Sequence, residues 1–226
     1  MELKLKPHQK SAIRKMHNGC ILCGGTGSGK SITGLAYYFI QNGGTVEPMT
    51  KMKNPKDLYI ITTAKKRDSG EWLGDMSWFH LTPDDNSKIY DHKIVIDSWN
   101  NIKKYADVKN SFFIFDEQRV VGYGAWTKSF LKIAKANDWI LLSATPGDNY
   151  MDYMPVFIAN GFYKNKSEFT AEHCVYSRFS KFPQIERFIG TERLNRLRRR
   201  VLVDMPYQNP AVQHHEDVWC SFNKEA

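Results

Sequence analysis

The chain has 226 residues, which is long enough for one large domain or for one domain with an appendage. Apolar residues make up 42% of it, and the longest unbroken apolar run, Leu35 to Ile40, is too short for a transmembrane helix. The net charge of +8 favours contact with a polyanion such as nucleic acid. Because the N-terminus lacks the apolar segment of a secretory signal, we expect a cytoplasmic (intracellular) protein.

The first 146 residues alternate between helical and apolar segments. A short helix is expected to begin at Pro7 and to stop at Asn18-Gly19. Strands are expected at residues 20–23, 58–63, 93–97, 112–115 and 139–143, and further helices at 30–41, 98–105 and 125–136. Short apolar strands joined by crossovers predict an α/β domain with a mainly parallel sheet flanked by helices.

The strand pattern weakens after Pro146. Three basic and aromatic segments follow, and all three are predicted to be mostly helical: residues 152–163, 166–179 and 191–203. We therefore expect a core at residues 1–146 and a helical C-terminal extension of the same lobe at residues 147–206.

The stretch GGTGSGKS at residues 24–31 fits the pattern G-x-x-x-x-G-K-[ST], which marks a phosphate-binding loop when it lies between a strand and a helix. Glycines let the backbone N–H groups surround a phosphate chain at the start of the following helix. Lys30 is expected to contact the β and γ phosphates of ATP, and the Ser31 hydroxyl to bind Mg²⁺. The other residues expected to bind the nucleotide are Gly25, Thr26, Gly27, Ser28 and Gly29.

A second part of this predicted site follows the apolar strand FFIF. Asp116 and Glu117 come directly after it, some distance along the chain from Lys30. Asp116 is expected to hold Mg²⁺, directly or through water, and Glu117 to orient and activate the water that attacks the γ phosphate. An acidic pair alone is weak evidence, but one at the end of a buried strand is strong.

Several segments together resemble the superfamily-two helicases and translocases, and within them the Swi/Snf-like ATPases. In order these are LKPHQKSAI, GGTGSGKS, FDEQR, LLSATPGDN, YMDYMPVFIANGF and LRRRVLVDMP. The resemblance implies a RecA-like lobe, adenine recognition by Gln9, and coupling of the ATP site to nucleic acid through Ser143 and Thr145. Gln118 and Arg119 depart from the residues that many relatives carry after the acidic pair.

The same resemblance implies a second RecA-like lobe, with ATP between the lobes and DNA, duplex or single-stranded, across their top. Residues 1–146 are then the core of the first lobe, and residues 207–226 the start of a linker to the second. Since the arginine finger of this family lies in the second lobe, the chain by itself is expected to hydrolyse ATP weakly or not at all.

Two polar stretches are candidates for contacts with nucleic acid. One is formed by Thr63, Lys65, Lys66 and Arg67 at the end of an apolar strand, where hydroxyls and cations suit backbone phosphates. The other is formed by Ser98 and Asn100, with Trp99 between them as a possible base-stacking or core residue. The alternative for the first stretch is a solvated basic turn.

Three functions remain open from the sequence. The favoured one is the N-terminal motor lobe of an ATP-dependent DNA helicase or translocase. The second is another phosphate-loop enzyme, such as a nucleotide kinase or a self-contained ATPase, and the third is a non-catalytic nucleic-acid binding module. ATPase assays with and without duplex and single-stranded DNA would separate them.

Overall fold

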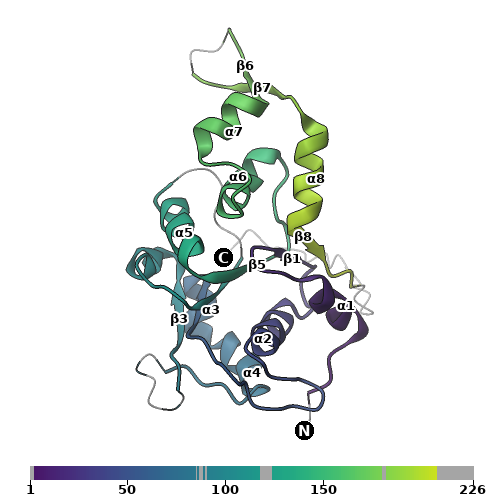
Figure 1. Ribbon diagram of the computed structural model, residues 1–226, viewed down its shortest axis with the longest axis vertical. Helices are drawn as coiled ribbons and strands as arrows, with labels where there is room; N and C mark the ends of the chain where they lie inside the picture. The colour runs from purple at the N-terminus through teal and green to yellow at the C-terminus, as the bar shows by residue number, and fades with distance from the viewer. Residues whose placement is uncertain are drawn as a thin grey trace, which may run out of the picture.

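The computed structural model describes residues 3–84, 86, 89, 91–117, 124–179 and 182–207. Six parallel strands form one sheet in the order β3-β2-β4-β5-β1-β8 (Figure 1). The strands are β1 Ile21–Cys23, β2 Leu58–Thr62, β3 Ile94–Ser98, β4 Phe112–Asp116, β5 Asp138–Ser143 and β8 Leu202–Asp204. Five of them match the expected strands to within one residue at each end.

Apolar side chains on both faces explain why these short segments form strands. In β4 every residue is buried, and its side chains alternate between two cores. Phe112 and Ile114 belong to the core on one face, while Phe113 and Phe115 belong to the core on the other. A central strand that is apolar on both sides is typical of a parallel sheet covered by helices.

One core is covered by α1 Pro7–Lys15, α2 Lys30–Gln41 and α4 Glu71–Ser77, and the other by η1 Trp99–Tyr105, α5 Ala125–Ala136 and α6 Tyr150–Ala159. The helices α2 and α5 begin and end where the sequence predicts. The expected helix at 98–105 is a 3-10 helix that starts one residue later. The predicted α/β fold with a parallel sheet flanked by helices is confirmed.

The basic stretch after β2 is not a turn. It forms α3 Ala64–Ser69, whose N-cap residue Thr63 accepts a hydrogen bond from the Lys66 N–H. Gly70, in the left-handed region at φ 71°, ends α3 and begins α4. Neither helix was expected, because α3 and α4 are short and contain few apolar residues at helical spacing.

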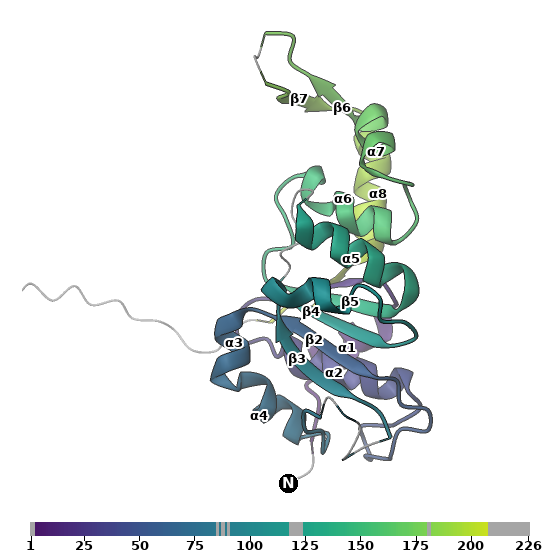
Figure 2. The same ribbon diagram turned by 90° about the vertical axis from the view of Figure 1, so that its left-hand side faces the viewer.

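The segment after β5 is only partly helical. Helices α7 Lys166–His173 and α8 Thr191–Val201 lie in the predicted segments, and α6 begins two residues before its segment. Two of these segments also contain residues of strands. Residues after α7 form β6 Cys174–Tyr176, which pairs with the antiparallel strand β7 Ile185–Phe188. Figure 2 shows this hairpin at the end of the extension farthest from the sheet.

The third unexpected strand is β8, which directly follows α8 and pairs in parallel with β1. Residues 202–204 therefore belong to the main sheet although they lie in the stretch assigned to the extension. The division at residue 147 stays a prediction, and most of residues 207–226 lies outside the described part of the chain. Within the described residues, no helix has the length and apolar character needed to cross a membrane.

Candidate nucleotide site

The predicted nucleotide-binding residues meet at the carboxyl edge of the sheet. Because all six strands are parallel, the loops that follow β1, β2, β4 and β5 emerge at this edge. Cys23 at the end of β1 lies beside Ser143 at the end of β5, and Asp116 at the end of β4 lies beside Leu142. The phosphate-binding loop and the acidic pair, far apart in the sequence, thereby follow the two strands that flank β5.

The phosphate-binding loop at residues 24–29 requires glycine at two positions. Gly27 and Gly29 have φ values of 77° and 82°, which other residues rarely adopt. At Gly29 a Cβ atom would also lie 2.5 Å from the Gln9 Nε2 atom. At Gly25 and Gly27 a Cβ atom would meet no atom within 4 Å, so this part of the loop borders open space.

Lys30 is the first residue of α2, and its side chain folds back over the loop. Its Nζ atom donates hydrogen bonds to the carbonyl oxygens of Gly24 at 2.7 Å and Gly25 at 3.0 Å. Partial burial and the nearby Lys66 ammonium lower the pKa of Lys30. The Ser28 hydroxyl is buried and finds no hydrogen-bond partner among the described residues.

Gln9, expected at the adenine, lies against the loop on α1. Its side chain is 5% exposed, its Oε1 atom accepts from the Lys6 N–H at 2.8 Å, and its Nε2 atom donates to the Gly29 carbonyl at 3.4 Å. The neighbouring His8 contacts the Ser28 carbonyl at 3.1 Å. The first helix is thus attached to the phosphate-binding loop.

Asp116 is buried at the end of β4, with 1% of the residue exposed. Its Oδ2 atom accepts a hydrogen bond from the Thr62 hydroxyl at 2.9 Å, and its carbonyl accepts one from the Trp99 ring N–H at the same distance. Trp99 is therefore a core residue that supports the acidic pair. Glu117 follows at φ 54°, a strained conformation for a residue with a side chain, and its side chain is 42% exposed.

Lys66 links both carboxylates, which the sequence did not predict. Its Nζ atom lies 3.1 Å from the Asp116 Oδ2 atom and 3.2 Å from the Glu117 Oε1 atom. Partial burial alone would lower the pKa of Lys66, but the two carboxylates outweigh it and raise this pKa. Lys66 therefore stays protonated beside the acidic pair, and its predicted contact with nucleic acid stays a prediction.

The other predicted nucleic-acid residues lie around α3 and β3. Arg67 contacts Asp97 at 3.2 Å and the Ser98 hydroxyl at 3.4 Å, while Ser98 is 2% exposed. Burial would raise the pKa of Asp97, but the hydrogen bonds that it accepts lower this pKa; the donors are the Asn101, Tyr105 and Arg67 side chains and the Ser98 N–H. Asn100 and Lys65 are exposed.

The two expected coupling residues lie next to the phosphate-binding loop. The Ser143 carbonyl accepts a hydrogen bond from the Gly24 N–H at 3.2 Å, and its hydroxyl accepts one from the Thr145 N–H at 3.2 Å. The end of β5 is therefore joined to the phosphate-binding loop by a hydrogen bond, and the coupling role of these two residues stays a prediction. Gln118 and Arg119 lie outside the described residues.

Asp75 on α4 is a member of this cluster that the sequence analysis missed. Asp75 is half-buried, and a side-chain hydrogen bond with Ser31 and the charges of Lys66 and Asp116 are among the influences on its pKa. Burial is the main cause of a raised pKa at Asp75, and the Ser31 hydrogen bond and Lys66 oppose it. No motif marks this residue, and only the placement of α4 brings it to the site.

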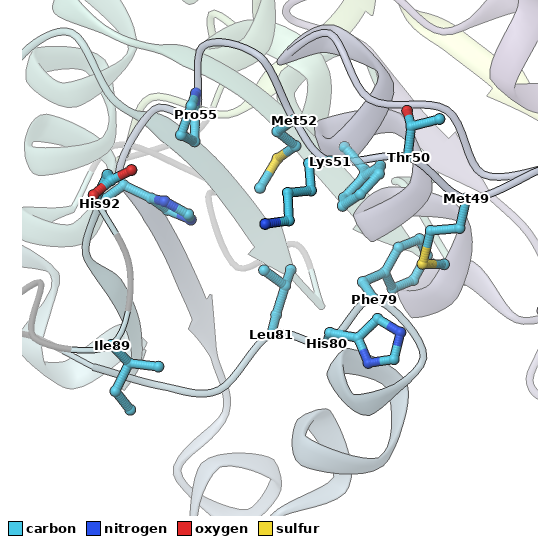
Figure 3. Close-up of a pocket in the computed structure, with 12 residues that line it drawn as sticks. Met49, Thr50, Lys51, Met52, Pro55, Phe79, His80, Leu81, Ile89 and His92 are labelled. Atoms are coloured by element: carbon cyan, nitrogen blue, oxygen red, sulfur yellow. The ribbon is translucent and has the colours of Figure 1, made fainter.

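A pocket of about 590 Å³ lies elsewhere, near the amino ends of β2 and β3. Phe39, Met49, Met52, Phe79 and Leu81 are among the residues that line it, and Figure 3 shows Lys51 extending into it. None of the predicted nucleotide-binding residues lines this pocket. The phosphate-binding loop and the acidic pair lie at the opposite edge of the sheet.

Comparisons with known proteins give the fold a context. No protein-family model matches the chain, and no curated protein matches its sequence. Among solved structures, the Sulfolobus solfataricus SWI2/SNF2 ATPase core in complex with dsDNA is similar with a TM-score of 0.65 and 18% identity, covering 91% of this chain and 45% of that chain. The chain therefore shares the fold of part of that ATPase core.

A second similar structure is the Pyrococcus furiosus Hef helicase domain, with a TM-score of 0.47 and 16% identity. The match covers 76% of this chain and 41% of that one. The ATPase-lobe fold implied by the resemblance in the sequence is confirmed by the Sulfolobus structure, while the roles of individual residues stay predictions. The match spans less than half the length of either solved chain.

Proposed function

We propose that this chain is the ATP-binding motor lobe of an ATP-dependent DNA helicase or translocase of the Swi/Snf-like type. The observation that carries the proposal is the meeting of Lys30 and Ser31 with Asp116 and Glu117 at one edge of the sheet. A non-catalytic binding module would not need this set of groups. A nucleotide kinase would share it, but the likeness in fold to an ATPase core that is solved with dsDNA favours the motor.

The residues present suit ATP and Mg²⁺. The glycine-rich loop borders open space where the backbone approaches a phosphate chain, and it begins α2, whose N-terminus favours negative charge. The oxygen atoms of Ser31, Asp116 and Asp75 are of the kind that Mg²⁺ prefers in proteins. When bound, the ion would neutralise charge on the β and γ phosphates.

Each residue of the chain then has a distinct task in the proposed reaction. Lys30 leaves the Gly24 and Gly25 carbonyls to contact the phosphates, and Asp116 and Ser31 hold the metal. Glu117 orients the attacking water and accepts its proton. Because Lys66 contacts Glu117, it has to release this carboxylate or reorient it before the carboxylate can act as a base.

Lys30→Ala is expected to weaken ATP binding by about tenfold to a hundredfold, since hydrogen bonds to charged groups contribute about 1.5–3 kcal/mol. The measurement is titration with a fluorescent ATP analogue in the presence of Mg²⁺. Lys109→Ala, at an exposed lysine before β4 and so at the opposite edge of the sheet, is the matched control. Unchanged affinity in Lys30→Ala would remove this lysine from the nucleotide site.

DNA is the proposed polymer, and α3 is its proposed contact. Neutralising Lys65, Lys66 and Arg67 together is expected to weaken binding to all DNA sequences. It is also expected to lower the slope of log affinity against log salt concentration by the equivalent of up to about three phosphate contacts. Lys65→Ala alone is expected to lower this slope by the equivalent of about one phosphate contact. Lys65 makes no ion pair with any residue that the structure describes, whereas Lys66 and Arg67 contact carboxylates.

Fluorescence anisotropy with labelled duplex and single-stranded DNA over a range of salt concentrations tests this prediction. Lys109→Ala again serves as the control for the loss of one surface charge. If the triple variant has the affinity and salt slope of the parent protein, α3 is only a solvated basic surface.

The proposal includes a second RecA-like lobe, joined to this one or supplied as a separate chain. The Sulfolobus ATPase core, which is about twice as long as the matched region, supports this part of the proposal. The decisive assay is ATP hydrolysis with and without duplex and single-stranded DNA, in the presence of both lobes. DNA-stimulated turnover supports a motor; phosphate transfer to a small acceptor would instead support a kinase.

A further inference from the structure

One ammonium of the chain bridges the acidic pair. The Lys66 Nζ atom lies 3.1 Å from the Asp116 Oδ2 atom and 3.2 Å from the Glu117 Oε1 atom. The Asp116 side chain is 2% exposed and the Lys66 side chain 25%, so water and salt screen this contact only in part. Because the proposed function assigns Asp116 to Mg²⁺, Lys66 and the metal ion need the same carboxylate.

Lys66 lies on the helix that is also the proposed DNA contact. Its backbone N–H donates to the Thr63 hydroxyl at 3.3 Å at the start of α3, which fixes the main chain but not the flexible side chain. The residue before it, Lys65, is exposed and makes no ion pair with any residue that the structure describes. A phosphate bound at Lys65 is within reach of Lys66, since neighbouring Cα atoms are only about 3.8 Å apart and a lysine side chain is long.

We propose that Lys66 switches between two anions: it binds the acidic pair in the absence of Mg-ATP, and a DNA backbone phosphate when Mg-ATP is bound. The switch rests on the proposed ATPase function and adds a regulation to it. Lys66 carries one positive charge and Mg²⁺ carries two, so a pair of carboxylates favours the metal ion. Because two cations at one carboxylate repel each other, Lys66 then leaves Asp116 for the surface of α3.

The release of Lys66 has a consequence at each of the two sites. Glu117 loses a contact to its Oε1 atom, and this atom becomes available to the attacking water. The helix α3 gains a second cation for DNA beside Lys65. Nucleotide and DNA therefore favour each other's binding, and the factor is the same in both directions.

The test is the DNA affinity of the chain with and without Mg²⁺ and a non-hydrolysable ATP analogue. In the parent protein the Mg-nucleotide is expected to tighten binding to labelled duplex DNA by about fivefold or more, the lower end of the usual coupling between two sites. The slope of log affinity against log salt concentration should become steeper by about 0.9, the value of one further phosphate contact. Fluorescence anisotropy over a range of salt concentrations measures both quantities.

Lys66→Met keeps most of the length of the side chain without its charge, so the DNA affinity of this variant should not respond to the Mg-nucleotide. The gain in nucleotide affinity that Mg²⁺ provides over EDTA, measured without DNA, should rise by about fivefold or more, because no ammonium competes for Asp116. Lys65→Met is the matched control on the same helix. It is expected to lower the salt slope equally with and without nucleotide, and to keep the response to nucleotide.

Lys66→Gln is a second variant, whose uncharged amide can still donate a hydrogen bond to the buried Asp116. If both Lys66 variants respond to the Mg-nucleotide as the parent does, or if the gain from Mg²⁺ is unchanged in both, the switch is overturned. If the parent binds Mg-nucleotide and DNA without any mutual effect, the switch alone fails. If the parent binds neither of them, or binds nucleotide without any effect of Mg²⁺, the proposed function fails as well.

Discussion

Glu117→Gln is expected to bind ATP with nearly the affinity of the parent protein while its hydrolysis falls by about a hundredfold or more, the usual contribution of a positioned general base. The amide has the shape of the carboxylate but cannot accept the proton of the attacking water. Glu117 contacts Lys66 at 3.2 Å, and its side chain is 42% exposed, so the change leaves the core of the sheet intact.

Phosphate release at saturating ATP, with DNA present, measures the effect, and nucleotide titration measures the retained affinity. Glu192→Gln, an exposed glutamate in the first turn of α8, is the matched control. Turnover in Glu117→Gln equal to that of the parent would remove Glu117 from its role as the base. A loss of ATP affinity in place of hydrolysis would show that Glu117 is needed for binding instead.

Addition of a second RecA-like lobe, by fusion or as a separate chain, is expected to raise DNA-stimulated ATP turnover by about a thousandfold or more, the value of an arginine finger. The finger has to reach the γ phosphate from across the nucleotide. Several arginines of this lobe have other partners: Arg67 contacts Asp97, Arg193 contacts Glu172, and Arg198 lies over the Tyr153 ring.

The chain by itself is expected to fold, to bind Mg-ATP weakly and to turn it over near the background rate. Steady-state hydrolysis with DNA and without the second lobe tests this directly. Circular dichroism of the same sample shows whether a low rate reflects an unfolded protein. Turnover of about 1 per second or faster by the chain alone, which is within the usual range of enzymes, would show that it needs no second lobe.

The sequence was sufficient for five of the six strands of the main sheet and for the grouping of the nucleotide motifs. Five strands were predictable because each contains a short apolar run of the kind that a parallel sheet covered by helices buries on both faces. Their common direction then brings the phosphate-binding loop and the acidic pair to one edge. Residues 202–204 were not predicted as a strand, because three residues after a basic helix are too few to show an alternation of apolar and polar residues. They form a strand by pairing with β1.

The positions of Lys66 and Asp75 could not be predicted for a related reason. Each lies on a helix of six or seven residues that sequence patterns do not reveal, and its partner is on another element. Lys66 was predicted to contact nucleic acid because it follows a strand in a basic stretch, yet its ammonium lies against Asp116 and Glu117. Such contacts depend on how α3 and α4 are placed, which tertiary packing decides.

The position of β1 in the sheet has a consequence for synthesis on the ribosome. This strand precedes the other described strands in the chain, but its two neighbours are β5 and β8, whose residues follow more than a hundred positions later. While β2, β3 and β4 are already able to pair with one another, the emerging chain has no described strand to place beside β1 until residue 138. Long-range pairing of this kind is slow and leaves unpaired strand edges exposed. The segment that carries the phosphate-binding loop is therefore enclosed in the sheet late in synthesis, after β2, β3 and β4.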